Sequence, residues 1–123
     1  MIIDIEKRRV EEIVTEYATI LRFEGGASIR IEGLARISGP GRGTILHPQS
    51  IRSDREVHAL LGRIAESASA DDESGALRIS FEGGLILEVG PDPDFEPWVA
   101  NWPDGTTVVA LPGGGLSTWG AQP

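Results

Sequence analysis

One stretch of sequence decides the fold class: Tyr17-Ala-Thr-Ile-Leu-Arg-Phe-Glu-Gly-Gly-Ala-Ser-Ile-Arg-Ile31. A related stretch, Gly75-Ala-Leu-Arg-Ile-Ser-Phe-Glu-Gly-Gly-Leu-Ile-Leu-Glu-Val89, follows at an offset of 58 residues. In each, Glu-Gly-Gly separates two segments in which apolar residues recur at alternate positions. A period of two is typical of a β-strand with one buried face, and glycine readily adopts the positive φ of a tight turn. Both stretches therefore predict a β-hairpin with one apolar face.

The flanking sequence extends each hairpin into a half of the chain, giving an internal repeat of about 8–48 and 63–119. A second hairpin is expected in each half, over residues 35–46 and 97–111. In the latter, Pro103-Asp-Gly105 predicts a type I turn followed by a glycine bulge. Residues 10–17 fit a helix or a strand, and the repeat favours the strand. The 16 glycines and 8 prolines fall between short apolar stretches, as in a chain of many short strands.

One helix is expected between the halves, at residues 54–61. Ser53-Asp-Arg-Glu56 has the pattern of a capping box, in which hydroxyl and carboxylate accept hydrogen bonds from unpaired amides. Apolar residues follow at helical spacing, namely Val57, Leu60, Leu61 and Ile64, and Gly62 is placed to end the helix. The predicted fold is mainly β (α+β), with antiparallel sheets from two related halves and this capped helix packed on one face.

Length and composition set the broad class. The 123 residues, with a mass of 13.2 kDa, suit a single domain over residues 1–123. Hydrophobic residues are 40% and charged residues 24%, so neither disorder nor a membrane protein is expected. No apolar run approaches ~20 residues and the first residues lack signal-peptide order, so we expect a cytoplasmic protein. The absence of cysteine excludes disulfides, thiolate metal sites and cysteine nucleophiles.

The net charge of −8 is distributed unevenly along the chain. Residues 1–63 carry nine acidic and ten basic residues, whereas residues 64–104 carry ten acidic residues and one basic residue, Arg78. Residues 105–123 carry no charged side chain. An acidic surface of this kind repels nucleic acid and anionic lipid and attracts a cationic partner. The alternative is a solvated surface that keeps the protein soluble.

No catalytic pattern is present, so we expect a protein that is not an enzyme and that uses no cofactor or metal. His47 and His58 are isolated and lack metal-ligand spacing. The stretch Gly115-Leu-Ser-Thr-Trp119 begins like a nucleophile elbow around Ser117, but its fifth residue is tryptophan where the motif requires glycine. The glycine-rich segments neither end in Lys-Ser/Thr nor open a helix, which argues against a phosphate site. Asp92-Pro-Asp-Phe-Glu96 has alternate carboxylates, which favours an acidic turn over a weak cation site.

The tryptophans indicate where a partner would bind. All three lie in the last 26 residues, and acidic residues flank two of them. Aromatic rings supply rigid contact area while carboxylates steer a basic protein. The expected partner-binding residues are Asp92, Asp94, Glu96, Trp98, Trp102, Asp104 and Trp119. The alternative is that the tryptophans fill the core.

The C-terminal half carries a resemblance. Pro91-Asp-Pro-Asp-Phe-Glu-Pro-Trp98, Pro103-Asp-Gly105, Leu111-Pro-Gly-Gly114 and Leu116-Ser-Thr-Trp119 resemble small actinobacterial proteins known only as a domain of unknown function, the six-one-eight-eight series. The hairpin around Phe23 is similar as well, so the resemblance covers most of the chain. It supports the fold and implies no activity.

Three functional hypotheses follow. The first is a cytoplasmic binding protein, immunity-like or antitoxin-like, that engages a basic protein through the acidic, tryptophan-bearing surface. The second is a small-molecule-binding or enzymatic β domain with a pocket lined by Trp98 and Trp119, which requires a well-formed cavity. The third is a homodimer or larger homo-oligomer joined through sheet edges.

Overall fold

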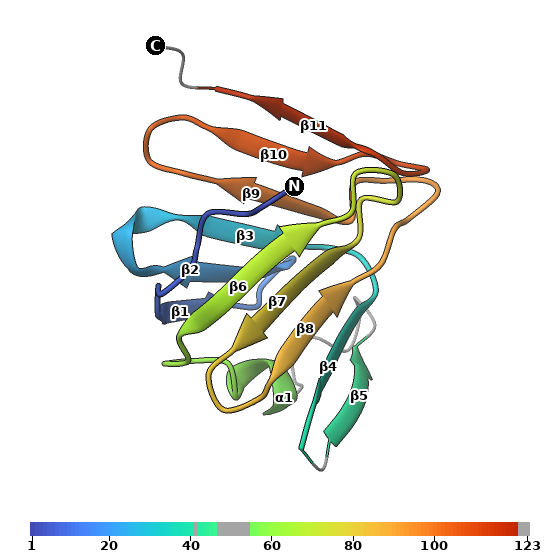
Figure 1. Ribbon diagram of the computed structural model, residues 1–123. Helices are drawn as coiled ribbons and strands as arrows, with labels where there is room; N and C mark the ends of the chain where they lie inside the picture. The colour runs from blue at the N-terminus through green and yellow to red at the C-terminus, as the bar shows by residue number, and fades with distance from the viewer. Residues whose placement is uncertain (41, 47–54, 121–123) are drawn as a thin grey trace.

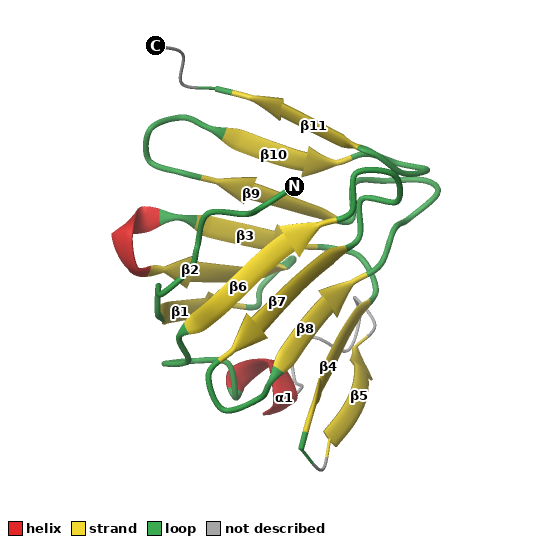
Figure 2. Ribbon diagram, viewed as in Figure 1, coloured by secondary structure: helices red, strands yellow, loops and turns green. Residues whose placement is uncertain are grey.

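The computed structural model describes residues 1–40, 42–46 and 55–120 and consists mainly of β-strands in two antiparallel sheets (Figures 1 and 2). The strands are β1 Val10–Val14, β2 Thr19–Phe23, β3 Ser28–Ile31, β4 Ala35–Gly39, β5 Arg42–Leu46, β6 Ala65–Ala70, β7 Leu77–Phe81, β8 Ile86–Val89, β9 Trp98–Asn101, β10 Thr107–Ala110 and β11 Leu116–Trp119. The six-stranded sheet has the order β1-β2-β3-β9-β10-β11, and the five-stranded sheet has the order β5-β4-β8-β7-β6. The five-stranded sheet packs across the face of the other.

Each sheet combines strands from both halves of the chain. The meander β1-β2-β3 is extended by β9 and β10, and the meander β6-β7-β8 is extended by β4 and β5. At the first junction Ile31 lies opposite Trp98, and at the second Val89 lies opposite Ala35. Ile31 and Val89 occupy the same place in the related stretches, so the two junctions are equivalent. The halves have thus exchanged their second hairpins.

The two Glu-Gly-Gly turns have matching conformations. Phe23 N donates to Ala27 O and Phe81 N donates to Leu85 O, both at 2.8 Å. The first glycine of each turn has a φ of 85° or 89°, a region that glycine adopts without steric cost. The first turn contains a short 3-10 helix, η1 (Glu24–Gly26). Local sequence thus produces the same turn in both halves.

The two halves meet at a corner with local twofold symmetry. Residues 8–10 pair antiparallel with residues 63–65 about a bridge between Arg9 and Ile64. Two reciprocal backbone hydrogen bonds flank this bridge, both 2.9 Å long. The guanidinium groups of Arg8 and Arg63 then reach the carbonyl groups of the two Glu-Gly-Gly turns.

The N-terminal arm, residues 1–7, runs along the outer edge of β6. Ile3 N donates to Ala68 O at 2.9 Å, and the α-amino group of Met1 donates to Ala70 O at 2.9 Å. The chain then turns at Lys7, which has a φ of 65°, and enters β1 in the other sheet. This arm therefore covers one edge of the five-stranded sheet and ties the sheets together.

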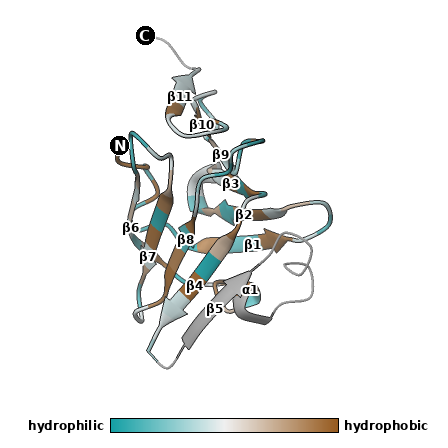
Figure 3. Cartoon of the chain, turned by 90° about the vertical axis from the view of Figure 1, so that its right-hand side faces the viewer, coloured by the Kyte–Doolittle hydropathy of each residue, from teal (hydrophilic) through white to brown (hydrophobic). Residues whose placement is uncertain are grey.

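The core lies between the sheets and consists of the alternating inward side chains. Its largest fully buried members include Trp98, Phe23, Phe81, Leu21, Ile29, Ile37 and Leu77. Figure 3 shows the alternation of hydrophobic and hydrophilic residues along β6, β7 and β4. Thr19 is the buried polar exception, and its hydroxyl has no partner among the described residues.

The expected helix over 54–61 is not confirmed. The structure has a single helical turn, α1 (Arg55–His58), and Ser53 and Asp54 lie outside the described residues. The amides of Leu60, Leu61 and Arg63 each bond to the carbonyl three residues back, as in successive turns, whereas Gly62 N donates to Val10 O. Gly62 has a φ of 82°. Val57 and Leu60 are nevertheless buried in the core. Among the described helices, none is long and apolar enough to cross a membrane.

Candidate functional site

Three loops pack together where β6, β8 and β10 end. They are the β6–β7 loop (71–76), the β8–β9 connection (90–97) and the β10–β11 turn (111–115) (Figure 1). Gly113 N donates to Asp92 O at 2.7 Å, which joins the second and third loops. A Cβ on Gly114 would lie 2.8 Å from Glu73 O, so the first loop packs closely on the third.

Trp98 holds the first of these loops from inside. Its side chain is 0% exposed, and its Nε1 donates to Gly75 O at 2.8 Å. A buried indole needs such a partner, and the carbonyl would otherwise lack one. The expectation that Trp98 contacts a partner is therefore wrong, because this residue belongs to the core.

The β6–β7 loop presents three exposed carboxylates. Asp71 accepts hydrogen bonds from Ser74 N at 2.8 Å and Glu73 N at 2.9 Å. These bonds, the one from Ser74 first, lower the pKa of the Asp71 carboxyl. Asp72 lies 3.5 Å from the α-amino group of Met1. Asp71 thus stabilises the loop, whereas the neighbouring Asp72 and Glu73 expose their charges to solvent.

The β8–β9 connection repeats this arrangement around an aromatic residue. Asp92 accepts hydrogen bonds from Asp94 N at 2.8 Å and Phe95 N at 3.1 Å. Asp94 and Glu96 are exposed, and Phe95 between them is 47% exposed. No ion pair reaches Asp94 or Glu96 from the part of the chain that the structure describes.

We call this surface the acidic end. Its members are Asp71, Asp72, Glu73, Asp92, Asp94, Phe95 and Glu96. Sequence reasoning missed Phe95 because it weighed the tryptophans alone. Two prolines lie on either side of Asp92 and a third follows Glu96. They prevent a regular strand that would bury one face of this segment, so they could have indicated that Phe95 is exposed.

The other expected contact residues lie at the opposite end of β9. Trp102 Nε1 donates to the carbonyl of Asp4 at 3.0 Å, and its ring packs partly against the core. Asp104 accepts a hydrogen bond from Thr106 N at 2.8 Å, which lowers the pKa of the Asp104 carboxyl. Asp104 lies in the expected turn, where Gly105 has a φ of 93°. Trp119 is 53% exposed on β11.

The seven expected residues therefore do not form one face. Asp92, Asp94 and Glu96 precede β9, whereas Trp102 and Asp104 follow it, with Trp98 buried between. The described residues also form no pocket that Trp98 and Trp119 line together. Trp98 points into the core, whereas Trp119 points away from it, because its neighbour Thr118 lies opposite the buried Val108.

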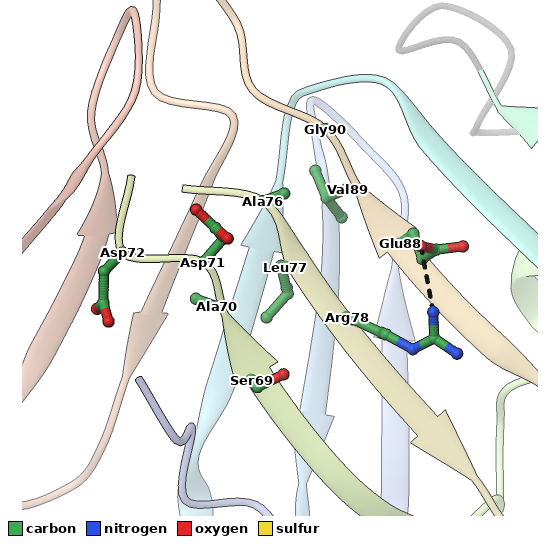
Figure 4. Close-up of a pocket in the computed structure, with 10 residues that line it drawn as sticks. All are labelled: Ser69, Ala70, Asp71, Asp72, Ala76, Leu77, Arg78, Glu88, Val89 and Gly90. Atoms are coloured by element: carbon green, nitrogen blue, oxygen red, sulfur yellow. Dashed lines mark ion pairs between the residues drawn. The ribbon is translucent and has the colours of Figure 1, made fainter. Parts of the chain in front are cut away.

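A shallow hollow of about 530 Å³ adjoins the acidic end (Figure 4). Asp71 and Asp72 lie at one side of it, and Arg78 and Glu88 lie at the other, 3.6 Å apart. Because Arg78 is already paired with Glu88, the hollow has more negative than positive charge. It is open to solvent and contains no nucleophile with an adjacent base.

Within the described residues, none of the remaining chemical candidates forms a site. The described residues include no group of three histidine, aspartate or glutamate side chains that could hold a metal ion. His58 is exposed as the last residue of α1, and His47 lies outside the described residues. Ser117 lies within strand β11 rather than at a strand-to-helix turn.

Comparison with known proteins gives one match. No curated protein and no solved structure matches the chain significantly. A family model, described as a family of unknown function (DUF6188), matches residues 1–120. The chain therefore belongs to the DUF6188 family.

Proposed function

We propose that this protein is a non-catalytic binding protein whose acidic end engages a basic protein partner. The observation that carries the proposal is the grouping of six carboxylates on two loops that both pack against the β10–β11 turn, one of which also exposes the ring of Phe95. Among the described ion pairs, one involves this surface, between Asp72 and the α-amino group of Met1. The remaining charges are therefore available to a partner.

Electrostatics favours a cationic protein over other partners. Unpaired carboxylates on neighbouring loops produce a negative potential that accelerates encounter with a basic surface. The same potential opposes the phosphates of nucleic acid and anionic lipids. An exposed aromatic ring among the charges provides contact area that a solvated acidic surface lacks.

The loops are already ordered for binding. Asp71 and Asp92 each accept two backbone hydrogen bonds within their own turn, and Trp98 fixes the first loop from the core. Little conformational entropy is then lost when a partner binds. The adjoining hollow offers space for a lysine or arginine side chain near Asp71 and Glu88.

We propose that a protein with such a surface acts as an immunity-type or antitoxin-type protein. Neutralising a cationic effector requires a small, acidic and rigid partner and no chemistry of its own. The proposal places this interaction in the cytoplasm.

The test is co-purification of bound proteins from cell extract at low and high salt, with a charge-reversal variant. Glu73→Lys, Asp94→Lys and Glu96→Lys together bring the six negative charges of the acidic end to a net charge of zero, while leaving the turn-forming Asp71 and Asp92 intact. The control reverses Glu6, Glu11 and Glu66, which are exposed near the start of β1 and β6.

We expect a basic protein that binds the wild type and the control at low salt, binds weakly at high salt, and is lost from the acidic-end variant. Binding that ignores salt, or that survives the three substitutions at the acidic end, would contradict the proposal.

A further inference from the structure

β11 is an addition to the paired architecture of the two sheets. The first five strands of the six-stranded sheet match the five strands of the other sheet, and among the described strands β11 has no counterpart. It contributes little to the core: Thr118 and Trp119 are exposed, and Leu116 is only partly buried. Figure 3 shows β10 and β11 projecting beyond the five-stranded sheet.

The free edge of β11 presents unpaired backbone groups. Leu111 N donates to Gly115 O, so by antiparallel alternation Ser117 and Trp119 bond to β10. The N–H and C=O groups of Leu116 and Thr118 therefore point outward. Within residues 1–40, 42–46 and 55–120, nothing bonds to them.

This edge also lacks the protection that exposed edges usually have. Native edge strands carry charges, prolines or bulges, or lie under another segment, because unpaired edges aggregate. The edge of β6 lies under the N-terminal arm, and β1 carries Glu11 and Glu12. β11 has the sequence Leu-Ser-Thr-Trp and pairs with β10 without a bulge.

Apolar side chains lie on both sides of the edge. Trp119 is 53% exposed on the outer face of the sheet. On the inner face, a hollow of about 260 Å³ is lined by Val108 and Thr118 together with Met1 and Ile2, and Ile2 is 87% exposed. A strand added to β11 would cover apolar surface on both faces.

We propose that β11 pairs with β11 of a second copy of this chain, antiparallel and about a twofold axis. Each copy carries a net charge of −8, so two copies repel wherever acidic surfaces approach, whereas residues 105–123 carry no charged side chain. A twofold axis makes one strand complementary to itself. With the axis at Ser117, Leu116 of each copy lies opposite Thr118 of the other, and the outward groups of both bond reciprocally.

The test is the mass of the purified full chain, without any partner, by light scattering and sedimentation over a range of concentrations. We expect twice 13.2 kDa for the wild type. Ser117→Lys places two like charges opposite each other at the axis and should weaken the dimer about tenfold or more. Thr118→Pro removes an outward amide that β10 does not use and should also give a monomer.

Ser67→Lys is the matched control, because it adds the same charge to an exposed strand position on β6. It should remain a dimer. A monomeric wild type at all concentrations would overturn the proposal. A dimer that persists in Ser117→Lys would also overturn it. Neither result bears on the acidic end, which is tested through binding of a basic protein.

Discussion

The meanders β1-β2-β3 and β6-β7-β8 have the same strand pairing but different surfaces. In the first, arginines and glutamates pair across the exposed face, with Arg22 and Glu12 at 2.8 Å and Arg30 and Glu32 at 3.4 Å. In the second, the exposed acidic residues greatly outnumber the bases, and Arg78 is the only base in residues 64–104. Apart from Thr19, the inward side chains are apolar in both.

This difference distinguishes the residues that specify the fold from the exposed residues that can vary and so acquire a function. The inward positions and the Glu-Gly-Gly turn determine the sheet, so they are alike in both halves. The exposed side chains of the loops beyond the strands are not constrained by packing, and they are acidic in the second half alone. Four predictions test this comparison, from the largest expected effect to the smallest.

The largest effect is expected from the two equivalent phenylalanines. Phe23 and Phe81 are each buried in the core before a Glu-Gly-Gly turn. Truncation of either to alanine should reduce the free energy of unfolding by about 3–5 kcal/mol, because it removes apolar contacts and leaves a cavity. Urea denaturation followed by tryptophan fluorescence measures both. A loss below about 1 kcal/mol for one of them would break the equivalence of the halves.

The two junctions between hairpins differ at Trp98, because the equivalent residue in the other junction is Ala35. Trp98→Phe leaves the carbonyl of Gly75 without its hydrogen bond and should cost about 1–3 kcal/mol. Trp119→Phe is the control at an exposed ring and should change stability by about 0.5 kcal/mol or less. Equal effects of the two substitutions would contradict the structural role given to Trp98.

The two turns should respond alike to alanine. Gly25→Ala and Gly83→Ala each place a side chain at positive φ and should cost about 1–2 kcal/mol. Gly90→Ala is the control, since a Cβ there meets nothing within 4 Å and φ is not in the left-handed region. Thermal unfolding compares all three, and a clear cost in only one turn would show that the turns are not equivalent.

The smallest effect is expected from pH. Hydrogen bonds from backbone amides lower the pKa of Asp71 and of Asp104, so their stabilising contribution is present above the ordinary carboxyl value of about 3.9 and is lost as pH falls through the lowered value. Unfolding measured between about pH 2 and pH 6 should show this loss. Asp71→Asn together with Asp104→Asn should flatten the pH dependence, and an unchanged profile would contradict the assignment.

The strands could be predicted because the sequence features that specify them lie within each short segment. Alternation over Thr19 to Phe23 and over Leu77 to Phe81, with glycines between the strands, specifies a hairpin without reference to the rest of the chain. The exchange of hairpins between sheets depends on pairing of β3 with β9 and of β8 with β4, which no local pattern encodes. The helix was overestimated because a capping box reports local preference, whereas packing after Val57 favours turns.

The site was predictable in its charge but not in its grouping. The excess of acidic residues between 64 and 104 predicted an acidic surface, and Asp92, Asp94 and Glu96 lie together on it. That this surface binds a partner stays a prediction. Trp98 and Trp102 are four residues apart, a spacing that puts two side chains on the same side of a strand, but this spacing does not distinguish the inner face from the outer. Phe95, in a loop with no periodicity, was therefore overlooked.

The central claim is that the acidic end, and not the matching surface of the first half, attracts cationic partners. Titrating the isotope-labelled protein with a short peptide of arginine and aromatic residues, and following backbone amides by NMR, tests it most directly. The account predicts salt-sensitive shifts concentrated in residues 71–74 and 92–96, with none around the turn at Glu24. Shifts spread evenly over both halves, or centred on the first, would contradict it.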